Sequence, residues 1–166
     1  MTNWRGENKL VGIGPRIKRD LLLGLAIGIA FYGISKLIPA LGTIGLPPGT
    51  QAIGDSLGKI LLVVIVAPVV EELFFRGALL DILDTKLKLS FFVAALISSA
   101  FFSFYHFTAY GASLSAASGS FILAGFVGFG LCYVRKYADS NTPNIIIHAV
   151  LNFLILVTTL SLVTFG

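Results

Sequence analysis

The chain has 166 residues, of which 56% are hydrophobic and only 12% are charged, whereas an ordinary soluble domain has about 25% charged residues. So few charges cannot cover the surface of a water-soluble domain of this length. That class is therefore excluded, and a single membrane domain, residues 1–166, is predicted. The net charge is +4, and the lone Cys132 excludes an internal disulfide.

Five hydrophobic segments are long enough to cross a bilayer, which takes about 20 residues in a helix. They run over residues 21–41, 56–80, 89–110, 119–134 and 144–163. The fourth is the shortest and carries Gly125, Gly128 and Gly130, small residues that let helices pack closely. We therefore expect an all-α, polytopic membrane helix bundle of about five transmembrane helices.

The basic residues predict the orientation of these spans, because cytoplasmic loops are enriched in Lys and Arg. With a cytoplasmic amino terminus, only Lys36 and Lys59 of the 12 basic residues fall near the outer side. The others fall near the inner side: Arg5, Lys9, Arg16, Lys18, Arg19, Arg76, Lys86, Lys88, Arg135 and Lys136. Residues 1–19 are thus predicted to be a basic cytoplasmic segment. The first span is longer than a signal-peptide core of about 7–15 residues, which indicates an uncleaved helix.

Ionisable residues inside the spans are few, and they are the candidates for a functional site. A charged group at the bilayer centre costs about 2.5–3.5 kcal/mol on insertion scales, so such residues mark function by default. Glu71 and Glu72 are the two acidic residues with no place in a loop or at a span end, and His106 and His148 also fall in predicted spans. The remaining acidic residues are Glu7, Asp20, Asp55, Asp81, Asp84 and Asp139.

The segment PVVEELFFRGALL, residues 68–80, places three charges in a very apolar stretch. Glu72 and Arg76 are four residues apart, so one helical face can close an ion pair. Glu71 is turned by about 100° from Glu72 and has no such partner in its own helix, which suits it to take a proton or to polarise a water. Pro68 removes a backbone hydrogen bond just before the glutamates and is predicted to kink or loosen the helix.

Two further pairs share the four-residue spacing. Phe102 and His106 fall on one face of the third span, and His148 and Asn152 fall on one face of the fifth. An imidazole and a carboxamide on one face supply two donors that suit a developing oxyanion, and a histidine near Glu71 suits the deprotonation of water. Taken singly, each feature has a structural explanation, such as an ion pair, a histidine bonded to a backbone carbonyl, or a packed aromatic ring.

Three motifs therefore hold every ionisable residue that is predicted to be buried, in the order Glu-Glu-x-x-x-Arg, Phe-x-x-x-His and His-x-x-x-Asn. Their residues are Glu71, Glu72, Arg76, Phe102, His106, His148 and Asn152. In this order they resemble the signatures of the CAAX-protease and bacteriocin-processing family of intramembrane proteases, which includes the type II CAAX prenyl endopeptidases. The resemblance covers residues 57–153, the predicted protease core.

The resemblance implies an endopeptidase that hydrolyses a peptide bond in or at the bilayer. In such a site Glu71 and His106 activate the attacking water, and His148 and Asn152 form the oxyanion hole. The residues that support the site are Glu72, Arg76 and Phe102. The expected partners are a membrane-associated peptide or protein substrate and the lipid bilayer, with no nucleic acid, and the expected location is the prokaryotic cell membrane.

The sequence favours chemistry without a cofactor. Zinc proteases usually carry His-Glu-x-x-His on one helix together with a further ligand, and here no predicted helix carries two histidines. Two histidines and two glutamates on three helices nevertheless leave a divalent metal such as zinc open. A serine mechanism is disfavoured, because the chain has no Gly-x-Ser-x-Gly motif.

Two other functions stay open: a carboxylate–histidine proton relay in a small transporter, and a non-catalytic membrane scaffold of the same family. The chain is also short beside the CAAX endopeptidases, so a prenylated substrate does not follow. At 1.5 Å per residue, His106 lies about 27 Å along a helix from Lys88, whereas His148 lies about 10 Å from Asn141. A common site for the two histidines therefore needs tilted helices, a displaced helix start or a deep wet cavity.

Overall fold

The computed structural model describes residues 16–37, 57–109 and 114–165, and the regular elements within these ranges are all helices. In chain order they are α1 (Ile17–Leu37), α3 (Leu57–Leu61), η2 (Leu62–Val66), α4 (Ala67–Glu72), η3 (Leu73–Leu79), η4 (Ile82–Lys86), α5 (Phe91–Ala109), α6 (Leu114–Ala138) and α7 (Thr142–Phe165). The prediction of an all-α fold is confirmed. Most of the predicted basic segment 1–19, with Arg5, Glu7 and Lys9, and also Asp55 lie outside the described residues.

Four helices, α1, α5, α6 and α7, are long and apolar enough to cross a membrane. The predicted second span is helical too: residues 57–86 form one continuous helix, here called helix 57–86, which contains three π-helical stretches. Helix α6 extends beyond the predicted segment at both ends, because its flanking polar residues contain no proline and continue the helix where hydropathy falls.

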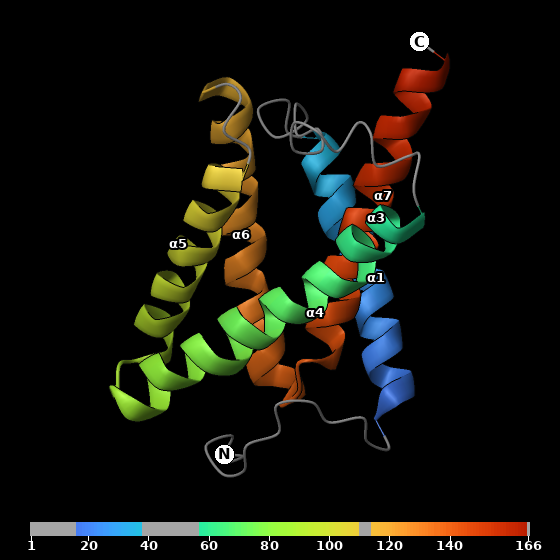
Figure 1. Ribbon diagram of the computed structural model, residues 1–166. Helices are drawn as coiled ribbons and strands as arrows, with labels where there is room; N and C mark the ends of the chain where they lie inside the picture. The colour runs from blue at the N-terminus through green and yellow to red at the C-terminus, as the bar shows by residue number, and fades with distance from the viewer. Residues whose placement is uncertain (1–15, 38–56, 110–113, 166) are drawn as a thin grey trace.

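The helices form two pairs that helix 57–86 crosses obliquely (Figure 1). Helix α5 packs along α6, and α1 packs along α7. Helix 57–86 contacts α7 through η2 and α4, and it contacts α5 and α6 through η3. Its middle part, which carries both glutamates, therefore faces helices of both pairs.

Glycines in α6 make room for large side chains from neighbouring helices. A Cβ atom on Gly128 would lie 2.9 Å from Nη2 of Arg76, and one on Gly130 would lie 2.7 Å from the ring of Phe31. These glycines therefore form the predicted packing face. The atoms that they accommodate belong to side chains rather than to a neighbouring backbone.

The α-helical stretch with the glutamates lies between two wide turns of helix 57–86. The π-helical η2 comes before it, and the N–H of Ala67 bonds the carbonyl of Leu62, five residues back. Pro68 follows directly, and the π-helical η3 begins after Glu72. The prediction that the helix is loosened next to Pro68 is confirmed. Wide turns of this kind are frequent at functional sites.

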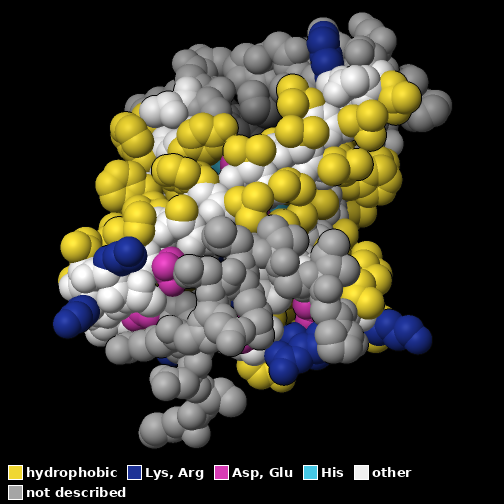
Figure 2. All heavy atoms as spheres, turned by 60° about the horizontal axis from the view of Figure 1, so that its bottom comes forward, with side chains coloured by type: hydrophobic (Ala, Val, Ile, Leu, Met, Phe, Trp, Pro, Cys, Tyr) yellow, Lys and Arg dark blue, Asp and Glu magenta, His cyan; other side chains and the backbone are white. Residues whose placement is uncertain are grey.

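Basic side chains gather at one end of the bundle, below a band of hydrophobic side chains (Figure 2). On this side α1 begins, and helix 57–86 and α6 end (Figure 1); the basic residues at these ends are Arg16, Lys18, Arg19, Lys86, Lys88, Arg135 and Lys136. The grouping agrees with the charge asymmetry in the sequence, and the cytoplasmic location of this end stays a prediction. Arg76 does not belong to this end, because its side chain is buried in the middle of the bundle.

The prediction that the buried ionisable residues all belong to the three motifs is wrong for two aspartates. Asp20 and Asp84 are only 2% and 1% exposed. Asp20 pairs with Arg19 at 2.8 Å, and the same guanidinium donates to the carbonyl of Ala138 at 3.2 Å. The burial of an acidic residue near a helix end depends on how the helices pack, which a hydropathy pattern does not reveal.

Candidate active site

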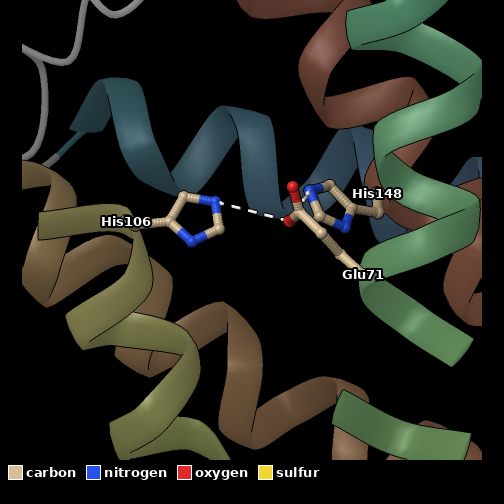
Figure 3. A group of neighbouring side chains, drawn as sticks. All are labelled: Glu71, His106 and His148. Carbon is tan, nitrogen blue, oxygen red and sulfur yellow. Dashed lines mark ion pairs between the residues drawn. The ribbon is translucent and has the colours of Figure 1, made fainter. Parts of the chain in front are cut away.

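Glu71 of α4, His106 of α5 and His148 of α7 point toward one another from three helices (Figure 3). Oε2 of Glu71 lies 3.8 Å from Nε2 of His106 and 3.7 Å from Nε2 of His148. Both separations exceed a direct hydrogen bond, which spans about 2.7–3.2 Å. The helices are inclined to one another (Figure 1), so two histidines at different distances from their helix ends reach the same carboxylate.

Glu72, the neighbouring carboxylate, is fully buried, and one of its oxygens has two partners. Its Oε1 accepts from Nη1 of Arg76 at 2.9 Å and lies 2.9 Å from Nδ1 of His148. The predicted ion pair is thus present. Because Glu72 is paired with a guanidinium, its oxygen acts as an acceptor and Nδ1 of His148 carries the hydrogen. The Nε2 atom of His148 is then the one that faces Glu71.

His106 is oriented in the same way by a different acceptor. Its Nδ1 lies 2.9 Å from the backbone carbonyl of Phe102. A carbonyl can only accept, so Nδ1 donates, and a neutral His106 presents the lone pair of Nε2 to Glu71. His106 thus makes the bond to a backbone carbonyl that was its structural alternative. The same bond leaves its second ring nitrogen, Nε2, directed toward Glu71.

Phe102 contacts three members of the site rather than apolar neighbours alone. The Cζ atom of Arg76 lies 4.1 Å from the centre of its ring, a cation–π contact. The ring centres of His106 and His148 lie 4.3 and 5.7 Å away. Phe102 therefore packs against the buried guanidinium and against both imidazole rings.

Asn152 lies one turn beyond His148 on α7, and its amide is directed elsewhere. Its Nδ2 donates to the backbone carbonyl of Val63 in η2 at 3.0 Å. A carboxamide nitrogen carries two hydrogens, so one of them is left for another acceptor. The role of Asn152 in an oxyanion hole stays a prediction.

Two further residues lie at the site without having been predicted to belong to it. Asn144 is fully buried, and its Nδ2 donates to the carbonyl of Leu131 at 2.9 Å. It precedes His148 by one turn, so a polar face of α7 running through 144, 148 and 152 was a signal that could have found it. Gly128 provides the space for Arg76, and no sequence signal tied that glycine to the arginine.

The donor set around Glu71 fits a divalent metal. One ligand atom from each of Glu71, His106 and His148 lies within 4.8 Å of the others. Two histidines and one glutamate are a ligand set of catalytic zinc sites. Metal-binding histidines also donate their other ring nitrogen to a carboxylate or carbonyl, as Nδ1 does in both rings here. The spacing of histidines along single helices gave no sign of this set, because each ligand comes from a different helix.

A bundle of long apolar helices around a carboxylate and two imidazoles defines an integral membrane protein with a buried site suited to hydrolysis. Residues 54–154 match the family described as Rce1-like, type II CAAX prenyl endopeptidase. This match includes all three motifs and more than half of the chain, so the chain belongs to the Rce1-like family. At the level of the family, the protein is a membrane protease. No curated protein and no solved structure matches the chain.

Proposed function

We propose that the protein is a multi-pass intramembrane endopeptidase of a prokaryotic cell membrane that cleaves a membrane-associated peptide or protein with an activated water. The observation that carries the proposal is the shared position of Oε2 of Glu71 between two Nε2 atoms, at 3.7 and 3.8 Å. That oxygen is buried without a hydrogen-bond partner among the described residues. Polar groups separated by more than about 3.5 Å are often bridged by water.

Glu71 and His106 have complementary roles toward that water. The water donates one O–H to the Glu71 carboxylate and the other to Nε2 of His106, and Glu71 then takes the proton as a general base. The water oxygen bonds to the carbonyl carbon of the substrate, and the carbonyl electron pair moves onto its oxygen. When the tetrahedral intermediate collapses, the C–N bond breaks and the leaving amine takes the proton back from Glu71.

His148 and Asn152 are the donors for the developing oxyanion in this proposal. Because Nδ1 of His148 is held by Glu72, its Nε2 can donate only when the ring is an imidazolium. The nearby charges are compatible with that form, since two carboxylates then balance one guanidinium and one imidazolium. Asn152 contributes its second amide hydrogen. Fixed donors in a site with little water are worth much more than donors in solution.

A metal-assisted peptidase is the second candidate, and the ligand set of Glu71, His106 and His148 favours it. A bound zinc ion supplies a Lewis acid that polarises a carbonyl. These three residues would hold the ion, and Glu72 and the Phe102 carbonyl would fix the two rings. Treatment with a chelator separates the candidates: cleavage without metal is expected to survive, whereas loss of activity that added zinc restores would favour the metal.

The test of the main proposal uses purified protein in liposomes with a panel of membrane peptides. Glu71→Gln keeps the size of the side chain and removes the base, so cleavage is expected to fall by about 10²–10⁴-fold. Asp139→Asn is the matched control, because Asp139 lies outside the site and its φ of 54° is tolerated by asparagine. Cleavage by Glu71→Gln at the rate of the control would overturn the assignment.

Cells offer a second comparison that also separates the non-catalytic alternatives. A proteomic comparison of cells with the unaltered protein and with Glu71→Gln is expected to show membrane proteins that accumulate uncleaved only with the variant. Rescue of the cellular function by Glu71→Gln would favour a scaffold. Proton flux in peptide-free liposomes that depends on Glu71, without peptide turnover, would favour a proton relay.

A further inference from the structure

The backbone carbonyl of Val63 lies in the π-helical turn before Pro68, and the hydrogen-bond pattern of this turn leaves it without an N–H donor from its own helix. In η2 the N–H of Ala67 bonds the carbonyl of Leu62, five residues back. The next N–H in this register would belong to residue 68, and Pro68 has none. An unsatisfied backbone carbonyl is costly in a membrane, where no water is at hand to bond it.

A side chain from α7 supplies the missing donor. Nδ2 of Asn152 donates to the Val63 carbonyl at 3.0 Å. One turn earlier on α7, Nδ1 of His148 bonds Oε1 of Glu72 at 2.9 Å. Helix α7 is therefore bonded to helix 57–86 at two points, one before Pro68 and one after Glu71. A single bond would let the two helices pivot about it, whereas two bonds fix their relative rotation and register.

We propose that Asn152 is a positioning residue as well as an oxyanion donor: it satisfies the carbonyl that Pro68 leaves without a partner and thereby holds Glu71 against His148. This inference rests on the proposed function, and it explains why a proline stands in a helix that carries the base. Pro68 produces the wide turn, and Asn152 joins that turn to α7. The two residues are thus expected to act as a coupled pair.

A double-mutant cycle of Asn152→Ala and Pro68→Ala tests the coupling, because coupled residues show non-additive effects. In the natural background, Asn152→Ala is expected to lower kcat by about 100-fold with KM little changed, since small displacements of a reacting group have effects of this size. With Pro68→Ala, a backbone N–H can replace the amide at Val63. In the Pro68→Ala background, Asn152→Ala should therefore lower kcat by only about tenfold, which is the effect expected from the loss of one oxyanion contact alone.

Equal losses in kcat in the two backgrounds would overturn the inference, because a pure oxyanion donor does not depend on residue 68. Thr158→Val is the matched control on α7. Its hydroxyl bonds the carbonyls of Leu154 and Ile155 in its own helix. Its substitution should leave kcat and the site unchanged in either background.

A second measurement needs neither peptide cleavage nor a folded Pro68→Ala variant. The chain has two histidines, so ¹⁵N-histidine labelling gives two imidazoles, and His106→Gln assigns them. Asn152→Ala is expected to shift the ring nitrogens of His148 and to speed hydrogen exchange at its Nδ1 by about tenfold or more, as expected when a hydrogen bond is weakened. An unaltered His148 spectrum would contradict the positioning role.

The two measurements also separate this inference from the proposed function. A shifted His148 spectrum in a protein that cleaves no peptide would sustain the positioning role and count against the endopeptidase. Cleavage that depends on Glu71, together with an unaltered His148 spectrum in Asn152→Ala, would sustain the endopeptidase and refute the positioning role.

Discussion

The two faces of helix 57–86 at the site differ in how closely their ionisable groups approach one another and in how exposed these groups are. On one face Glu72 and Arg76 have no exposed side-chain area and meet at 2.9 Å, with His148 bonded to the same carboxylate. On the other face the side chains of Glu71 and His106 are 13% and 20% exposed, and they lie 3.8 Å apart.

The difference shows how two adjacent glutamates can have opposite roles. The Glu72 face is buried, and Glu72 lies at hydrogen-bond distance from Arg76 and His148, so its charged groups join helix 57–86 to α7. The Glu71 face has longer separations and some access to solvent, so it can admit a water and a substrate carbonyl. The angle of about 100° between successive residues of a helix is enough to separate the two environments.

The largest expected effect on stability comes from breaking the Glu72 face. Arg76→Met keeps much of the side-chain volume and leaves Glu72 charged and unpaired, which should lower the free energy of unfolding by about 3–5 kcal/mol. Unfolding in detergent, followed by circular dichroism, measures this. Lys18→Met removes an exposed charge and should change stability by no more than about 0.5 kcal/mol. Equal stabilities of these two variants would contradict the comparison.

The open face is tested by His106→Gln. Loss of the imidazole that holds the water should lower kcat by about 100-fold, with the free energy of unfolding little changed because the ring is partly exposed. Peptide cleavage in liposomes and unfolding in detergent are measured on the same preparation. If the variant is inactive only because it is unfolded, or if it retains full activity, His106 has no catalytic role.

Gly128→Ala probes the space behind the Glu72 face. The added Cβ would lie 2.9 Å from Nη2 of Arg76, so the guanidinium must shift, and overpacking of this kind costs about 1–3 kcal/mol. Gly33→Ala is the matched control, since a Cβ there meets nothing within 4 Å. Gly128→Ala should therefore unfold at a lower temperature than Gly33→Ala, with a free energy of unfolding that is lower by about 1–3 kcal/mol. Identical unfolding temperatures would show that Arg76 adapts freely.

Phe102→Leu gives the smallest expected change, because the ring joins the two faces through weak contacts without a charge of its own. Loss of the cation–π contact with Arg76 should cost about 0.5–2 kcal/mol, and a looser His106 should lower kcat modestly. Phe101→Leu, at an exposed aromatic of the same helix, is the control for lost aromatic area. A Phe102→Leu variant indistinguishable from this control would show that the ring only fills space.

Helical periodicity predicts contacts within one helix much better than contacts between helices. The Glu72–Arg76 pair follows from a four-residue spacing, and the long apolar runs of α1, α5 and α7 predict those helices. The bond between His148 and Glu72 joins residues 76 positions apart, and no spacing rule indicates it. The motifs show that these residues matter, and packing decides which nitrogen of each ring faces Glu71.

The irregular parts of the site were the hardest to predict for the same reason. Pro68 indicates a disturbed helix, but its consequence, a free carbonyl at Val63, depends on the wide turn of η2. The partner of that carbonyl, Asn152, comes from another helix. The spacing to His148 predicts an oxyanion role for Asn152, whereas the bond to Val63 depends on how α7 packs against η2.

The central claim is that Glu71, and not Glu72, is the reactive carboxylate, and the single-turnover rate per folded molecule of Glu71→Gln and Glu72→Gln tests it most directly. Glu71→Gln should lose about 10²–10⁴-fold in rate with its folded fraction unchanged. Glu72→Gln should lose stability, and its folded molecules should cleave faster than Glu71→Gln. A folded Glu71→Gln that cleaves faster than folded Glu72→Gln would contradict the account.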